Sequence, residues 1–160
     1  MDQPNRPRPS LGDNYPVAGL MRAVLEKGKA FRFEARGTSM HPFIQDGDTV
    51  TVRPLASGRP RMGDVVAFVH SATGGVRVHR VVKADRGTYL LKGDNALGED
   101  GAFPREAILG RVGRVERRGR ARRLGPALRS AALARLSRSF WFTRLSRRAR
   151  RSLNRREGRS

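Results

Sequence analysis

A series of short segments in which apolar and polar residues alternate is the feature that most limits how this chain can fold. Phe31, Phe33 and Ala35 alternate with charged residues, and β-branched residues alternate again in VRVHRVVK over 76–83. Glycine and aspartate separate the segments, as in the turn at 46–48. This pattern predicts a mainly β fold, a compact sheet or barrel-like domain of short strands. The strands are expected over 31–35, 49–55, 64–70, 76–83, 88–92 and 108–115.

The residues before the first strand divide into two parts. Residues 1–14 contain three prolines and few apolar side chains, which predicts a disordered N-terminus. From residue 15 an apolar stripe at helical spacing predicts a short helix that ends near Gly28. The stripe consists of Val17, Leu20, Met21, Val24 and Leu25. We therefore place a single β domain with a short N-terminal helix in residues 15–116.

Positive charge is concentrated at the C-terminal end. Residues 117–160 hold sixteen arginines and one acidic residue, a net charge of +15, out of +20 for the whole chain. Leu133, Leu136 and Phe140 share one face, and Arg144, Arg147, Arg148, Arg151 and Arg155 form a basic stripe at helical spacing, which predicts a basic amphipathic helix in this tail. Such a helix, over 126–156, suits an anionic partner: phospholipid head groups, nucleic acid or an acidic protein.

Several classes of protein are disfavoured by composition. There is no cysteine and there are only three histidines, so we expect no disulfide, no metal site and no cofactor. No window reaches the roughly 18–20 apolar residues that span a bilayer, and the first residues lack the apolar core of a secretory signal. We therefore expect a cytoplasmic protein, or one held peripherally on the cytoplasmic face of a membrane.

Three kinds of side chain in the β domain have the chemistry of acyl transfer. Ser39, in GTSMHP over 37–42, is a nucleophile if a base activates it. His79 lies in the middle of an expected strand, where a fixed imidazole can act as general base and then as general acid. The loop LLKGDNALGEDG supplies Asp94 and Asp100 to orient that ring. A turn cap, a core histidine and plain turn aspartates are the structural alternatives.

Five motifs in order resemble the signal peptidase family. They are GTSMHPFIQDGDTVTV, MGDVVAF, VHRVV, LLKGDNALGED and AILGRV, and together they run from about Phe33 to Val115. Bacterial housekeeping members use a Ser-Lys dyad with the lysine directly before an arginine. Here that position is His79, and Lys83 and Lys92 are not at the dyad position. This resembles the eukaryotic-reticulum, archaeal and sporulation branch, which uses Ser, His and Asp.

The resemblance also implies roles for individual residues. Ser39 is the nucleophile and His79 the base. The triad aspartate of that branch lies six residues beyond the aspartate of Lys-Gly-Asp-Asn, which implies Asp100 and leaves Asp94 as a supporting or alternative acid. Met40 and Pro42 would lie beside the substrate. The activity implied is a serine endopeptidase that removes a leader or signal-type segment from a protein or peptide, bound as an added strand.

One part of the family's oxyanion site departs from the pattern. The Ser39 amide would be one donor to the oxyanion. The second donor of dyad relatives is a hydroxyl two residues before the nucleophile, where this chain has Gly37.

A second departure is the absence of an apolar span, because true signal peptidases carry a transmembrane anchor. Either the basic helix over 126–156 docks on an anionic membrane, or the substrate is soluble.

Other function classes fit parts of the sequence. One alternative is a nucleic-acid- or anionic-surface-binding protein with a degenerate peptidase fold, acting through the arginine-rich tail. Phe140, Trp141 and Phe142 would then stack on bases, although residues 1–116 contain no recognisable nucleic-acid module. A self-cleaving repressor of the related peptidase clan would need a DNA-binding domain before residue 37, where only one helix is expected. The oligomeric state is left open.

Overall fold

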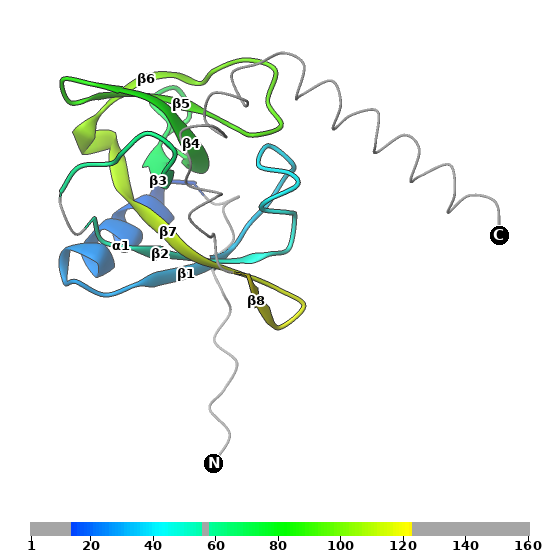
Figure 1. The fold of residues 1–160 in the computed structure, drawn as a ribbon. Coiled ribbons are helices and arrows are strands. Elements are labelled where there is room, and N and C mark those ends of the chain that lie inside the picture. Colours follow the sequence, from blue (N-terminus) through cyan, green and yellow to red (C-terminus); the bar gives the residue numbers. More distant parts are fainter. Residues whose placement is uncertain (1–13, 56–57, 123–160) are drawn as a thin grey trace.

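The computed structural model describes residues 14–55 and 58–122, which form one N-terminal helix and eight strands (Figure 1). The expected mainly β fold and its short N-terminal helix are confirmed. The elements are α1 (Asn14–Glu26), β1 (Phe31–Glu34), β2 (Thr49–Arg53), β3 (Val65–Val69), β4 (Val76–Asp85), β5 (Thr88–Lys92), β6 (Gly101–Pro104), a 3₁₀ turn (Arg105–Ala107), β7 (Ile108–Arg117) and β8 (Arg120–Arg122).

The strands form a single antiparallel sheet in the order β1-β2-β7-β3-β4-β5-β6, with β8 paired to β7. The register shifts within β2, β3 and β4, after Thr51, Ala67 and Val81. Such irregularities bend a strand and increase its twist. The sheet therefore curls, so that β1, β2 and β7 cross the lower part of the molecule in Figure 1 and β4, β5 and β6 the upper part.

Strand β3 separates two hydrophobic clusters, which explains why its sequence is apolar at every position. Val65 and Ala67 belong to the first cluster, and Val66 and Phe68 to the second. Because successive side chains of a strand point to opposite faces, one strand serves both clusters. The first cluster joins α1 to β1, β2 and β7. The second lies among β3, β4, β5, β6 and β7.

The helix α1 packs closely against the strands beneath it because Gly110 leaves no side chain in the way. A Cβ atom at Gly110 would lie 2.6 Å from the Arg53 carbonyl oxygen, 2.7 Å from Val52 Cγ1 and 3.1 Å from Leu25 Cδ1. The backbone of β7 therefore touches β2 and the end of α1 at a distance that only glycine allows.

Two strands were not expected from the sequence. β6 is only four residues long, GAFP, and precedes the 3₁₀ turn, and β8 lies within the arginine-rich range 117–160. A hairpin with Arg118 and Gly119 at positive φ, 50° and 72°, returns the chain along β7. Strand pairing therefore extends to Arg122.

The disorder predicted over 1–14 lies outside the described residues except for Asn14, the first residue of α1, and the helix predicted over 126–156 lies outside them entirely. No helix in 14–55 or 58–122 is long and apolar enough to cross a membrane.

Gly110→Ala should lower the free energy of unfolding by about 1–3 kcal/mol, the usual effect of overpacking, because its Cβ would press on backbone. Gly113→Ala is the matched control: its Cβ would meet only the flexible side chain of Arg53 at 3.0–3.3 Å. Urea unfolding of both variants checks the difference. Equal stabilities would contradict the close approach of β7 to β2 and α1 at Gly110.

Candidate active site

The segment that carries Ser39 joins β1 to β2 and is anchored on the first hydrophobic cluster. Met40 and Ile44 are buried in that cluster, and the Ile44 amide donates to the Met40 carbonyl at 3.0 Å. Gly37 enters the turn at a φ of 87°, and its amide donates to Asp46 Oδ1 at 2.8 Å. Ser39 itself is exposed. The anchored turn thus presents one hydroxyl at the surface.

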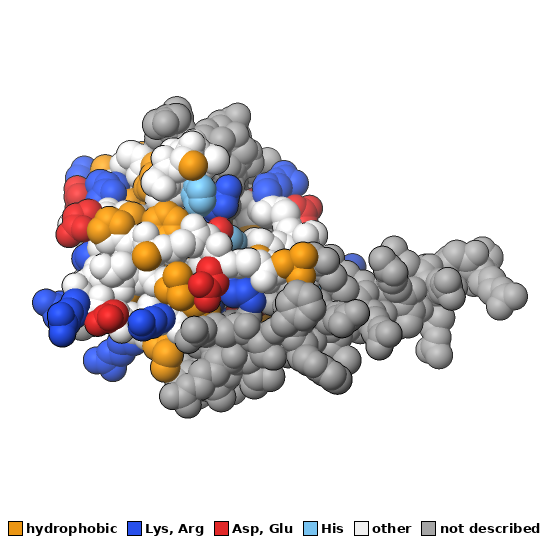
Figure 2. Space-filling model, turned by 90° about the horizontal axis from the view of Figure 1, so that it is seen from above, with side chains coloured by type: hydrophobic (Ala, Val, Ile, Leu, Met, Phe, Trp, Pro, Cys, Tyr) orange, Lys and Arg blue, Asp and Glu red, His pale blue; other side chains and the backbone are white. Residues whose placement is uncertain are grey.

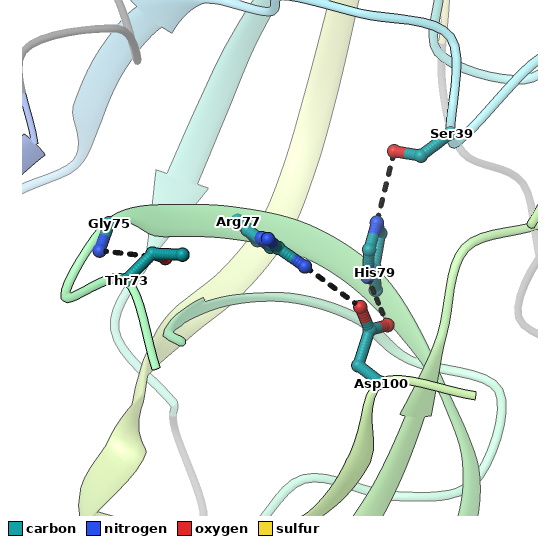
Figure 3. A network of polar contacts seen from close by, with 6 residues as sticks. All are labelled: Ser39, Thr73, Gly75, Arg77, His79 and Asp100. Atoms are coloured by element: carbon teal, nitrogen blue, oxygen red, sulfur yellow. Dashed lines mark hydrogen bonds and ion pairs between the residues drawn. The ribbon is translucent and has the colours of Figure 1, made fainter. Parts of the chain in front are cut away.

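His79 lies in the middle of β4, as expected, and is 5% exposed. It pairs with Val66 across the sheet and shares its face, so that its ring lies against Phe68 with centroids 5.7 Å apart. Its Nε2 atom is 2.9 Å from Ser39 Oγ, and its Nδ1 atom is 2.5 Å from Asp100 Oδ2. The structure therefore joins the three predicted residues in one line (Figure 3).

Asp100 ends the loop between β5 and β6, where its amide donates to the Leu91 carbonyl at 2.9 Å. Its Oδ1 atom accepts from Arg77 NH1 at 3.2 Å. Burial raises the pKa of Asp100, but the hydrogen bond and charge of His79, followed by the charge and hydrogen bond of Arg77, outweigh it. The pKa of Asp100 is therefore below its ordinary value.

The ionised carboxylate determines the tautomer of His79. A carboxylate without its proton can only accept, so the hydrogen of the imidazole lies on Nδ1 and is donated to Asp100. Nε2 then carries the lone pair and accepts from the Ser39 hydroxyl. This arrangement can remove a proton from Ser39 and stabilise the imidazolium that results.

Asp94, the alternative acid, is buried in an ion pair with Arg80 instead. Arg80 Nε and NH2 each donate to one carboxylate oxygen at 2.7 Å, and NH1 donates to the Gly63 carbonyl at 2.9 Å. Neither side chain is exposed by more than 1%. Asp100 is thus the partner of the His79 imidazole, and Asp94 is the partner of the neighbouring Arg80.

The loop that follows β5 also holds the turn of Ser39 close to His79. The Asn95 amide donates to the Ser39 carbonyl at 2.7 Å, and Asn95 Nδ2 donates to the Thr38 carbonyl at 3.1 Å. A Cβ atom at Gly93 would lie 2.7 Å from the Ser39 carbonyl oxygen and 3.1 Å from His79 Nε2. Only glycine lets this loop pass so close to both Ser39 and His79.

The other end of the serine segment is held by Asp48, which is 2% exposed. Arg117 Nε and NH2 donate to its two carboxylate oxygens at 2.8 and 2.7 Å, and the Gln45 amide donates at 2.8 Å. Burial raises the pKa of Asp48, but Arg117, the Gln45 amide and the charge of Arg122 outweigh it and lower the pKa. The end of β7 is thereby tied to the segment that carries Ser39.

A cavity of about 390 Å³ opens beside the hydrogen-bonded series of Ser39, His79 and Asp100. One wall is the stretch 35–37 after β1, and the other is the start of β4; Met40 and Ile44 lie between them with Ser39 and His79. Met40 thus lines the cavity, as expected of a substrate-binding residue. Pro42 is exposed and is not among the lining residues.

Sequence reasoning missed three residues of this site: Arg77, Arg80 and Asn95. Arg77 was detectable, because it lies two residues before His79 on the same face of a strand. The Gly37 amide, already bonded to Asp46, is not a second donor to an oxyanion. Within the described ranges, no three His, Asp or Glu side chains are placed to hold a metal ion.

Gly93→Ala should slow the reaction of Ser39 with a fluorophosphonate by about 10²-fold, since its Cβ would displace the serine turn from the imidazole. Gly98→Ala, in the same loop with nothing within 4 Å of its Cβ, should react like the wild type. Labelling rates by intact mass, with circular dichroism as the folding check, test this. An unimpaired Gly93→Ala variant contradicts the close approach.

Asp48→Asn should lower the free energy of unfolding by about 1–3 kcal/mol at neutral pH, because it leaves Arg117 without its carboxylate. The lowered pKa of Asp48 stabilises the fold above the ordinary aspartate value of about 3.9, and this stabilisation is lost as pH falls through the folded-state value. The difference from wild type should therefore shrink below about pH 3.9.

Urea unfolding across pH measures this difference, and Asp85→Asn, at an exposed position, is the control that should change little. A gap between Asp48→Asn and wild type that stays constant with pH would refute the ionic role of Asp48.

A model of the Peptidase S24-like family matches residues 8–115, more than half of the 160-residue chain. The matched range includes Ser39, His79 and Asp100. Among curated proteins, none matches this chain. The chain therefore belongs to the Peptidase S24-like family of serine peptidases.

Proposed function

We propose that this protein is a serine endopeptidase of the signal-peptidase type, which removes a leader or signal-type segment from a protein or peptide. Ser39 is the nucleophile, His79 the general base and Asp100 the residue that orients the imidazole. One observation carries the proposal. His79 Nε2 lies 2.9 Å from Ser39 Oγ, and His79 Nδ1 lies 2.5 Å from Asp100 Oδ2, beside an open groove. Histidine rather than lysine before Arg80 supports the Ser-His-Asp branch.

The first half of the reaction is acylation. His79 Nε2 takes the proton of Ser39 as Oγ bonds to the carbonyl carbon of the substrate. The oxyanion accepts from the Ser39 amide in this proposal. Collapse of the tetrahedral intermediate breaks the carbon–nitrogen bond, and the imidazolium gives its proton to the leaving amine. Asp100 stabilises the imidazolium throughout, and its lowered pKa keeps it ionised for this purpose.

The second half is hydrolysis of the ester. His79 removes a proton from a water molecule, which attacks the acyl carbon. The carbon–oxygen bond to Ser39 then breaks, and the hydroxyl recovers its proton from the imidazolium. Every proton that moves passes through Nε2, the atom that faces Ser39.

The substrate would bind as an extended segment between two stretches of backbone. β4 pairs with β3 over 76–80 but with β5 only from Arg80 onward. In the part of the chain that the structure describes, one edge of 76–79 therefore has no neighbouring strand, and these residues line the groove opposite 35–37. Unpaired strand edges accept an added strand through main-chain hydrogen bonds.

Ser39→Ala tests the proposal in two assays. The purified wild-type chain should be labelled by a fluorophosphonate at Ser39, and His79→Gln should slow labelling by about 10²–10⁴-fold, because the hydroxyl loses its base. In source cells, mass spectrometry of protein N-termini should show a few termini that are present with wild type and lost with Ser39→Ala. Those termini would identify the substrate.

Ser71→Ala, at an exposed serine outside the site, is the control and should behave as wild type in both assays. A folded wild-type chain that is not labelled would overturn the proposal. Loss of a terminus within the chain itself would show self-cleavage in place of cleavage of another protein. If Ser39→Ala changes no termini and the tail binds nucleic acid or anionic surfaces, the non-catalytic alternative is favoured.

A further inference from the structure

Arginine side chains stand on both walls of the groove beside Ser39. Arg36 lies on the wall that continues β1, three residues before the serine, and Arg77 lies on the β4 wall, two residues before His79. Among the described residues that line the groove there is no aspartate or glutamate. On the face seen in Figure 2, acidic side chains lie among the basic ones.

Each of these arginines keeps donors that point towards solvent. Arg36 NH2 contacts Glu34 Oε1 at 3.0 Å, and its side chain is 55% exposed. Arg77 NH1 contacts Asp100 Oδ1 at 3.2 Å, and its side chain is 41% exposed. A guanidinium carries five N–H donors, so one contact with a carboxylate leaves room for another. A carboxylate in the groove would gain hydrogen bonds strengthened by charge.

Most of the other side chains that line the groove are apolar. Ala35, Val76 and Val78 lie on the two walls, and Met40 and Ile44 lie between them. A segment bound there therefore offers small or apolar side chains to the middle of the groove and a charged side chain to its margin. A lysine or arginine at that margin would meet like charge, which Glu34 and Asp100 offset only in part because they contact the arginines but do not line the groove.

We propose that the groove selects peptides that carry an aspartate or glutamate at a fixed position near the cleaved bond, with Arg36 as a specificity-determining residue. This inference rests on the proposed endopeptidase function and names its substrate class. The leader that is removed is acidic or neutral next to the cut. It does not bring basic residues up to Ser39.

Profiling of peptide cleavage tests this with the full chain. A proteome-derived peptide library should yield cut sites with aspartate or glutamate enriched at one position. For a peptide taken from that set, glutamate-to-glutamine replacement at that position should lower kcat/KM roughly 1.5-fold to fivefold, the scale of a partly exposed charge pair. Arg36→Glu should reverse the preference and favour lysine there.

Arg32→Gln is the matched control for Arg36→Gln. Both arginines are 55% exposed and each contacts one glutamate, but only Arg36 lines the groove. Arg36→Gln should remove the acidic preference, and Arg32→Gln should keep it. Attraction by the arginine-rich range 117–160 would favour acidic residues anywhere in a peptide, whereas a contact with Arg36 favours one position.

The outcomes distinguish failure of this inference from failure of the proposed endopeptidase function. Ser39-dependent cleavage with no acidic position, or with a preference that Arg36→Glu leaves unchanged, overturns the inference and leaves the endopeptidase function standing. If the folded wild type shows neither labelling of Ser39 nor Ser39-dependent cleavage, both proposals fall.

Discussion

Arg80 and Asp94 form the buried contact on which the site depends. Two charge-assisted hydrogen bonds at 2.7 Å, a third to the Gly63 carbonyl, and Phe43 at 5.6 Å from the guanidinium compensate for the loss of water. Removal of either partner would leave a buried charge without compensation, which typically costs about 3–5 kcal/mol. Because Arg80 follows the base and Asp94 lies between Gly93 and Asn95, this pair places the loop that holds the Ser39 turn.

Strand periodicity explains how two aspartates of one loop acquire different partners. His79 and Arg80 are consecutive in β4, so their side chains point to opposite faces of the sheet. His79 shares its face with Val66 and lies against Phe68, while Arg80 pairs with Val65 on the other face. The loop after β5 passes the end of the sheet and supplies one carboxylate to each face. The His79 imidazole lies on one face only, so it cannot contact both carboxylates.

The sequence alone predicts six of the eight strands, and it predicts that alternate residues of β4 lie on opposite faces, because alternation is a local property. It places Asp94 and Asp100 in one loop but cannot rank them, since loop conformation depends on contacts made across the sheet. Only the resemblance to signal peptidases favoured Asp100. β8 was missed because its arginines look like the tail that follows, whereas the deciding feature is a two-residue turn at Arg118 and Gly119. The tie between Asp48 and Arg117 spans 69 residues and has no local signal.

In the proposed function, Arg77 would connect the chemistry of the site with its choice of substrate. The same guanidinium contacts Asp100 and lines the groove, so the charge that lowers the pKa of Asp100 would also face a peptide bound there. Arginine suits a position with two partners better than lysine does, because the planar guanidinium has N–H donors in several directions and its charge does not titrate. A substrate carboxylate that contacted Arg77 would compete with Asp100 for the guanidinium and weaken the effect of Arg77 on Asp100. A second cation nearby would lessen this competition. Arg36, on the opposite wall and away from the imidazole, supplies it.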